Sequence, residues 1–569
     1  MNPHPGSLSV LAQRLLITGV CLLPALAAGQ QAPQAPQVTP RDLRPETPPR
    51  PPAALPAPAP QAVPGKAETL FVVVGDITLV GAFPDLTATT QALIAPLRGQ
   101  RRSVADLYRL ADEIENQYRA AGYALVRVVV PPQSLKDGGT LTFTLIDGFV
   151  ERIDLAAVPE RARRQVQATL APLVGQRRLT SAALERALTL AGRGPGLSLR
   201  SALGAGQATG GTVLVLEGEH EPVVVSLSAD DRSSAALGPW QSSVQVRLNQ
   251  LGQRGEQLYF YVSGGADVAR MFQTDARRRV GGGGVIVPLG DSGLSLNPEF
   301  TVSDTKPTPA PLAPLSRSQL ERYTLRLIYP LILDRQQELT LTGTLDASRQ
   351  TDSLPDFNYV LDIDALRVAR LTVDWTRPLQ AGRLRVSSTY SQGFTELGAR
   401  TPVEIEATGI PMSRLGAKSS FKRLEMTASF DSGPLPWGLQ ARGVARAQWA
   451  LEGVMPGAEL FSLDGEDALS TFVAGAISDD GGWSLRQEVS RPMGGDIGGA
   501  ALGLSPYAFA AGGRVTTRIE GAATRGLAAS YGLGLRTQWR GASLSVEYGR
   551  RRIAGVNEDR AFLKGQVQF

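Results

Sequence analysis

Cysteine and histidine are almost absent from this 569-residue sequence. It contains one cysteine, Cys21, and two histidines, His4 and His220. Cys21 and His4 lie in an N-terminal segment that we expect to be removed, so disulfides, Cys–His sites, histidine-based metal sites and most catalytic triads are excluded. Phosphate-binding loops and the G-x-S-x-G and H-E-x-x-H patterns are also missing. We therefore expect no enzyme activity, with no catalytic residue, metal or cofactor.

Long apolar segments are also missing beyond the first 30 residues. No later run reaches the ~18 residues that a transmembrane helix requires. Near the N-terminus, Arg14 precedes the short apolar stretch Leu15–Ala28, which closes with the small-residue site Ala25-Leu26-Ala27. This pattern predicts a signal peptide over residues 1–28, and the stretch is too short for a membrane anchor.

Charge is neither abundant nor concentrated in one region. Charged residues make up 20% of the chain, and the formal net charge is +5. The basic residues are spread along the sequence, which argues against nucleic acid as a partner. Residues 29–66 are rich in proline and predict an extended, semi-rigid linker. This linker is either an inert tether or a docking segment for another protein.

Two units of similar size follow the linker, at residues 67–151 and 152–221. Each has the predicted order β-α-α-β-β. In the first, the segment Ser103–Gly122 predicts a helix that starts at a serine cap and stops at a glycine. The motif Ala95–Arg102, APLRGQRR, recurs as Ala171–Arg178, APLVGQRR. This recurrence indicates a tandem duplication.

One stretch of the first unit resembles a known family. Pro131–Ile153, PPQSLKDGGTLTFTLIDGFVERI, is similar to the end of the first POTRA domain of two-partner secretion outer-membrane transporters. Residues 175–217 resemble the second POTRA domain. These transporters form the haemolysin secretion/activation family, within the superfamily of POTRA plus β-barrel proteins. The resemblance implies two periplasmic α+β POTRA domains ahead of a membrane β-barrel.

Residues 222–569 alternate between apolar and polar side chains in segment after segment. In one segment, Leu544, Val546 and Tyr548 share a face. Apolar-out and polar-in alternation is the signature of a transmembrane β-barrel, and the length predicts about 16 antiparallel strands. A soluble all-β array also alternates, but it does not need ~10-residue strands along half a chain. The terminal Phe569 resembles an outer-membrane assembly signal, which implies insertion into outer-membrane lipid by the barrel assembly machinery.

A long irregular insert interrupts the barrel pattern at about residues 452–482. A loop of this length in a compact β-protein is usually functional or disordered. By resemblance, it is a lid folded into the pore. In the family, an arginine of the lid motif pairs with an aspartate of a Phe-x-Asp-x-Gly motif on the barrel wall. The matching positions here are Leu469, Ser470, Thr471 and Phe472 on the lid, and Phe509, Ala511 and Gly513 on the wall.

Both charged partners of that pair are replaced in this chain. Ser470 stands where arginine is expected, and Ala511 stands where aspartate is expected. Replacing both avoids an unpaired buried charge, so we expect a lid that is held differently. A contact of Phe472 with Phe509 is one hypothesis. The lumen arginines, Arg486 among them, either pair with acids in a wet pore or form an electropositive conduit for a polypeptide.

The sequence therefore predicts a transporter in the outer membrane of a Gram-negative bacterium, with its POTRA domains in the periplasm. By resemblance, the POTRA domains capture an unfolded, secreted partner protein, and the barrel conducts it. An assembly factor for other barrels and a passive porin are the alternatives. The Pro-Gln-x-Leu signature favours secretion over assembly, and the periplasmic domains argue against a porin. Some family members carry an N-terminal plug helix, and the proline-rich linker leaves its presence open.

Overall fold

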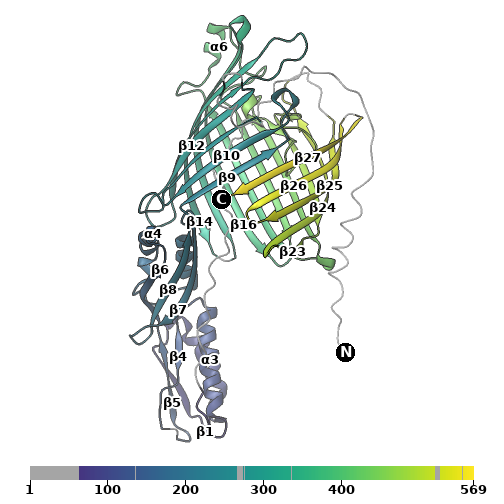
Figure 1. The fold of residues 1–569 in the computed structure, drawn as a ribbon. Helices are drawn as coiled ribbons and strands as arrows, with labels where there is room; N and C mark the ends of the chain where they lie inside the picture. Colours follow the sequence, from purple (N-terminus) through teal and green to yellow (C-terminus); the bar gives the residue numbers. More distant parts are fainter. Residues whose placement is uncertain are drawn as a thin grey trace.

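Two small α+β units extend from one end of a large β-barrel (Figure 1). The computed structural model describes residues 63–569, apart from 135, 266–272, 274–275, 335, 520–525 and 554. The predicted signal peptide and nearly all of the predicted linker lie outside the described residues. Within the described residues, no helix is long and apolar enough to cross a membrane. The same residues hold no group of three or more side chains suited to bind a metal ion.

The first unit packs two helices against a small sheet. Its elements are β1 (Phe71–Val73), β2 (Asp76–Val80), α2 (Thr87–Ile94), β3 (Arg101–Ser103), α3 (Val104–Ala120), β4 (Arg127–Val129) and β5 (Thr140–Ile146). The sheet order is β2-β5-β4, and β1 pairs with β3. Helix α3 begins at a capping box between Ser103 and Asp106. Its buried face, which includes Leu107, Ile114 and Tyr118, forms the core of the unit.

The second unit repeats this plan. Its elements are β6 (Phe149–Ala157), α4 (Glu160–Leu170), α5 (Ser181–Gly192), β7 (Leu197–Ala205) and β8 (Gly211–His220), with the sheet order β6-β8-β7. The repeated motif has the same structure in both units. Each copy begins with a single 3-10 turn, η2 (Ala95–Leu97) or η3 (Ala171–Leu173). Each then reaches a glycine, Gly99 or Gly175, with φ of 74°, a conformation that favours glycine.

The barrel closes with sixteen antiparallel strands, which confirms the predicted fold class. Its strands are β9 (Val223–Asp230), β10 (Gln241–Asn249), β11 (Gln257–Gly265), β12 (Arg278–Pro288), β13 (Ser295–Thr305), β14 (Arg317–Leu333), β15 (Glu338–Leu354), β16 (Tyr359–Leu379), β17 (Gly382–Phe394), β18 (Lys422–Ser432), β19 (Gln440–Glu452), β22 (Gly481–Ser490), β23 (Met493–Ile497), β24 (Ala500–Thr516), β25 (Ala528–Trp539), β26 (Ala542–Ile553) and β27 (Val556–Gln568). Strands β22 and β23 both pair with β24 and count as one interrupted strand. Helix α6 (Pro402–Thr408) lies in the connection between β17 and β18.

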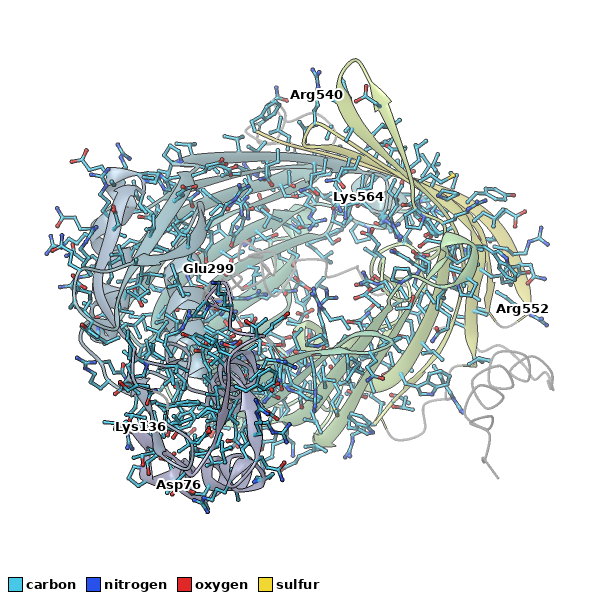
Figure 2. The ribbon with its side chains drawn as sticks, turned by 90° about the horizontal axis from the view of Figure 1, so that it is seen from below. Asp76, Lys136, Glu299, Arg540, Arg552 and Lys564 are labelled. Atoms are coloured by element: carbon cyan, nitrogen blue, oxygen red, sulfur yellow. The ribbon has the colours of Figure 1, made fainter. Side chains whose placement is uncertain are left out.

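The side chains of the strands alternate between the lumen and the outer surface. Along β22, Trp483, Leu485 and Val489 are exposed on the outside, whereas Arg486 and Glu488 are buried on the inside. Figure 2 looks into the barrel from the end that carries the POTRA units. Side chains from the strands line the inside of the ring, and the POTRA units lie under one part of the wall. This alternation is the predicted apolar-out, polar-in pattern.

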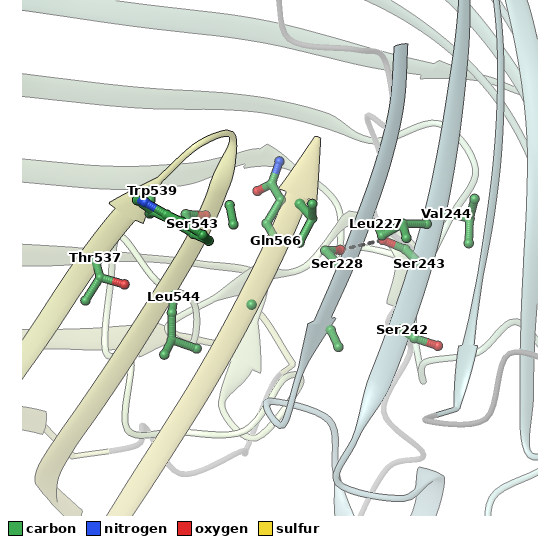
Figure 3. A pocket seen from close by; sticks show the side chains of 14 residues that line it. Leu227, Ser228, Ser242, Ser243, Val244, Thr537, Trp539, Ser543, Leu544 and Gln566 are labelled. Carbon is green, nitrogen blue, oxygen red and sulfur yellow. Dashed lines mark hydrogen bonds between the residues drawn. The ribbon is translucent and has the colours of Figure 1, made fainter. Parts of the chain in front are cut away.

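The seam of the barrel joins β27 to β9 through a short ladder. It runs from Lys564, opposite Asp230, to Gln568, opposite Ser226. A hollow of about 480 Å³ lies where these strands meet β10, β25 and β26 (Figure 3). Across the seam, Gly565 pairs with Ala229, which pairs with Ser242. The hollow follows from these three neighbouring small residues, because they leave space between larger apolar side chains such as Leu227 and Leu544.

Candidate functional site

The candidate site is the segment between β19 and β22, which folds into the barrel. It contains the turn η8 (Gly457–Glu459) and two short paired strands, β20 (Phe461–Ser462) and β21 (Ser478–Asp479). We call residues 453–480 the lid. Its apolar residues pack with the barrel wall into one buried cluster. The cluster comprises Phe461, Leu463, Leu469, Phe472 and Ile477 of the lid and Ala511, Val515 and Ala528 of the wall.

The four predicted lid-motif residues lie at the buried tip of the lid. Leu469, Ser470 and Thr471 are fully buried, and Phe472 is 4% exposed. The Thr471 hydroxyl donates to Ser530 Oγ of β25 at 2.8 Å, and the Thr471 N–H approaches the same oxygen at 3.4 Å. Since Ser530 is also fully buried, this contact ties the tip of the lid to the wall without solvent.

Ser470, at the position where the resemblance implies an arginine, instead accepts hydrogen bonds from two arginines. Arg486 of β22 donates from Nη1 to Ser470 Oγ at 2.6 Å. From the other side, Arg232 donates from Nη1 to the Ser470 carbonyl at 3.3 Å. Arg486 also donates from Nη2 to Glu547 Oε2 of β26 at 2.9 Å. The cation at the lid tip therefore comes from the wall, and the lid supplies the acceptor.

The predicted wall-motif residues all face this tip region. Ala511 lies directly across from Arg486 in the β22–β24 ladder. The Phe509 ring carries the Arg486 guanidinium on its face at 4.0 Å, which is a cation–π contact. A Cβ at Gly513 would lie 2.7 Å from Leu463 Cδ2 of the lid, so the close approach of the lid requires glycine there.

The hypothesis that Phe472 packs against Phe509 is not what the described residues show. Phe472 packs in the apolar cluster with Ala511 and lies 5.6 Å from the guanidinium of Arg551. Phe509 instead faces Arg486 and lies near Tyr507, with ring centroids 6.3 Å apart. The two rings have different neighbours because Arg486 already covers the face of Phe509.

The outer end of the lid is held by a second arginine. Arg414, in the connection between β17 and β18, donates from Nη1 to Asp480 Oδ1 at 2.6 Å and from Nη2 to Asp479 Oδ1 at 2.8 Å. Asp480 also accepts the backbone N–H of Met455 at 2.7 Å and that of Arg518 at 2.6 Å. This cluster therefore joins both ends of the lid to two neighbouring connections.

Further contacts attach the middle of the lid to the lumen wall. Lys564 of β27 pairs with Glu466 at 2.8 Å, and Arg442 of β19 pairs with Asp467 at 3.0 Å. Figure 2 shows Lys564 on the inside of the ring. These pairs are partly exposed, so each contributes little on its own.

Many lumen arginines are paired with acids. The sequence left two alternatives for these arginines, namely paired charges in a wet pore or an electropositive conduit. Arg326 contacts Glu299 at 3.2 Å, and both are buried. Arg385 pairs with Asp431 at 2.6 Å. This pattern favours the interpretation of paired charges in a polar lumen over a uniformly positive conduit.

The second POTRA unit is docked onto the barrel through helix α5. Arg186 donates to the carbonyl oxygens of Pro330 at 2.9 Å, Ser292 at 3.3 Å and Leu331 at 3.4 Å. Arg193, next to the end of α5, pairs with Glu338 at the start of β15. The docking surface therefore consists of strand ends and a turn on the POTRA side of the barrel. None of these contacts could be assigned from the sequence, because these residues carry no motif.

The two POTRA units are joined through the repeated motif of the second unit. The guanidinium of Arg177 lies over the Phe149 ring at 4.0 Å, and Arg177 donates to the carbonyl of Asp147 at 2.6 Å. The guanidinium of Arg178 lies over the Phe83 ring of the first unit at 4.4 Å. The Arg-Arg pair therefore acts at the junction, which fixes the first unit relative to the second.

His220, the remaining histidine, lies at the end of β8 opposite Leu197. Burial lowers its pKa, and the nearby Arg161 lowers the pKa further. The imidazole is therefore neutral at pH 7.

The barrel, its lid and the POTRA units together define a class of outer-membrane β-barrel proteins with periplasmic domains. The family model of the haemolysin secretion/activation protein ShlB/FhaC/HecB matches residues 210–537. The model of the ShlB-type POTRA domain matches residues 73–148. Because the first match covers more than half of the chain, the protein belongs to the ShlB/FhaC/HecB family of haemolysin secretion/activation proteins. The family predicted from the sequence is thus confirmed.

Individual relatives agree with this assignment. The chain is 26% identical over 506 residues to the hemolysin transporter protein ShlB of Serratia marcescens, covering 87% of this chain and 85% of that protein. It is 24% identical over 441 residues to the outer membrane transporter CdiB of Escherichia coli O6:K15:H31, covering 76% and 71%. The solved structure of CdiB from Escherichia coli matches with a TM-score of 0.71 at 21% identity, covering 91% of this chain and 94% of that one. This structural likeness supports the fold.

Proposed function

We propose that this protein is an outer-membrane transporter that secretes a partner protein by two-partner secretion. The observation that carries the proposal is the combination of two features in one family member. POTRA units are docked beside the barrel mouth through Arg186 and Arg193, and the lid is folded into the barrel and packed against its wall. A capture unit held at the entrance and a lid placed to close the pore are what controlled export of a polypeptide requires.

The POTRA units offer an edge for capturing an unfolded chain. Strand β7 is one of the two edge strands of the sheet β6-β8-β7. Its Leu197 is buried in the core of the unit, whereas Ser198 and Arg200 are exposed. An extended segment can add to such an edge through main-chain hydrogen bonds, which need no particular sequence. This capture mode therefore suits an unfolded partner.

The lumen wall suits the passage of an extended polypeptide. One part of it is lined by many hydroxyl groups, among them Thr342, Thr372, Thr389 and Thr427. Nearby charges of the wall are paired, as in the contact of Arg370 with Asp346 at 3.4 Å. Such a surface offers hydrogen bonds to a passing backbone without a strong single-sign field that would retain it.

An export assay tests the proposal. The transporter is expressed with the secreted protein encoded in the neighbouring reading frame, and that protein is measured in the medium. Deletion of Leu70–Gly218 is expected to abolish export while the barrel remains inserted and heat-modifiable on gels. Export that persists after the deletion contradicts the role of the POTRA units.

The same cells distinguish secretion from barrel assembly. If the protein is a secretion transporter, the amounts of other outer-membrane barrels stay unchanged when it is deleted. A general fall in those barrels identifies an assembly factor instead.

A further inference from the structure

We propose that Arg486 of the barrel wall is the residue that fastens the tip of the lid, with Ser470 as its acceptor on the lid. The proposal rests on the proposed function, in which the lid closes the export path. It assigns a positioning role to a residue outside both predicted motifs. It also exchanges the two roles that the resemblance implies. Here the arginine belongs to the wall strand β22, and the acceptor belongs to the lid.

The first argument is the geometry of Arg486. Its side chain is 3% exposed, and Ser470 is fully buried. The 2.6 Å contact from Nη1 to Ser470 Oγ is a hydrogen bond with a charged donor, which is stronger than a neutral one. The lid tip thus meets the wall at a point from which water is excluded.

The second argument is that other residues of the wall hold the Arg486 guanidinium in the orientation that this contact requires. Nη2 is held by Glu547 at 2.9 Å, and Glu488 lies 3.4 Å away. The guanidinium plane rests on Phe509 at 4.0 Å. Glu488 is itself held by Arg536 at 2.9 Å. The guanidinium is therefore oriented before the lid arrives, and Nη1 remains directed at the lid.

The third argument concerns what happens when the lid leaves. At the lid tip, Arg486 keeps its contacts with Glu547 and Glu488 when the lid leaves. The group that Arg486 loses there is a neutral hydroxyl, that of Ser470. Opening at this position therefore does not separate an ion pair, whereas the buried pairs of Glu459 with Arg370 and Arg423 lie elsewhere on the lid. The closed state is held by one charge-assisted hydrogen bond at this position.

The fourth argument is the register of the wall strands. Arg486 lies directly opposite Ala511, the position where the family's aspartate is expected. The small Ala511 side chain leaves the guanidinium without a carboxylate across the ladder. Nη1 is then available to the lid, so Ser470 and Ala511 are both compatible with Arg486 as the fastening residue.

Single-channel conductance of the purified protein in a planar bilayer tests the assignment. Ser470→Ala is expected to raise the open-to-closed ratio about 10- to 100-fold, since it removes a hydrogen bond to a charged group. Ser470→Arg is expected to open the pore more strongly, because it places a second guanidinium beside Arg486. Arg486→Ser is expected to open it as well, because the lid loses the charged donor to Ser470.

The decisive variant exchanges the two residues. In S470R/R486S the arginine moves to the lid, and Glu547 and Glu488 on the wall remain to receive it. We expect this variant to close more than either single variant. If the effects of the two single changes simply add in free energy, Arg486 does not fasten the lid.

A matched control separates this role from a general need for buried arginine. Arg326 is 5% exposed, pairs with Glu299 and belongs to β14, which five strands separate from β22 in the barrel order. Arg326→Ser is expected to leave the conductance unchanged, and an equal rise there would overturn the assignment. Conductance needs no secreted partner. A failure of export with this conductance pattern intact would therefore count against the proposed function and not against Arg486.

Discussion

Removal of the Arg414 side chain should loosen the outer end of the lid. Its guanidinium bridges Asp479 and Asp480, whose side chains are 10% and 0% exposed. Breaking a buried ion pair by removing one partner costs about 3–5 kcal/mol, because the remaining charge is left without compensation. Asp480 retains the N–H groups of Met455 and Arg518, so we expect the lower end of this range. About 3 kcal/mol corresponds to roughly a 100-fold change in a local opening equilibrium.

Hydrogen exchange measures this opening directly. The amide of Leu463 donates within the lid to Ile477 at 2.9 Å, and that of Leu469 donates to Leu463 at 2.9 Å. In Arg414→Met, both amides should exchange about 100-fold faster than in the unchanged protein.

An exposed pair at the same end of the barrel provides the control. Lys422 pairs with Glu452 at 2.6 Å, but their side chains are 41% and 60% exposed. An exposed pair contributes at most about 1 kcal/mol, so Lys422→Ala should change the exchange of the lid roughly fivefold or less. If the lid amides exchange at similar rates in the Arg414 and Lys422 variants, the contacts of Arg414 with Asp479 and Asp480 do not hold the lid.

Three other predictions follow from single contacts. Thr471→Val leaves the buried Ser530 hydroxyl without its partner, which costs about 1–3 kcal/mol, and should raise the open fraction in a bilayer about tenfold. Gly513→Ala places a Cβ 2.7 Å from Leu463 Cδ2 and 2.7 Å from a wall carbonyl. It should displace the lid, at a cost of about 1–3 kcal/mol, and lower the temperature of heat modification. Arg186→Ala removes the contacts of α5 with three barrel carbonyls and should broaden the POTRA-to-barrel distances measured between spin labels. A distribution unchanged from the parent would show that this docking is held elsewhere.

The parts of the fold that depend on local pattern could be predicted from the sequence. The barrel strands alternate with a period of two, and this alternation requires no knowledge of their partners. The duplication was visible because the motif Ala95–Arg102 recurs as Ala171–Arg178, and the structure shows Gly99 and Gly175 with the same φ of 74°. The lid was visible as a long insert between alternating segments.

The fastening of the lid could not be predicted in this way. Arg486 and Ser470 are 16 residues apart, but their contact depends on where the lid folds back into the barrel. Glu547 lies 61 residues from Arg486, and only the strand order brings the two together. From the sequence, Arg486 was one of several arginines on a polar face. The contact of Arg414 with the lid could not be predicted either, because Arg414 lies in a connection without a motif.

The expected contact of Phe472 with Phe509 illustrates the same limit. Both aromatic residues were matched to the two motifs by resemblance. Their side chains nevertheless take different neighbours, because the Arg486 guanidinium lies on the Phe509 ring at 4.0 Å. A contact inferred from Phe472 and Phe509 alone does not account for Arg486, whose side chain also reaches the Phe509 ring.

A reversible lock on the lid tests the central claim most directly. The hydroxyl oxygens of Thr471 and Ser530 lie 2.8 Å apart, so cysteines at these positions are close enough to form a disulfide with little movement. In T471C/S530C, we predict that export of the partner stops under oxidising conditions and resumes on reduction, while each single-cysteine variant exports under both. Export that continues through the oxidised, locked protein would contradict the claim that the partner passes where the lid lies.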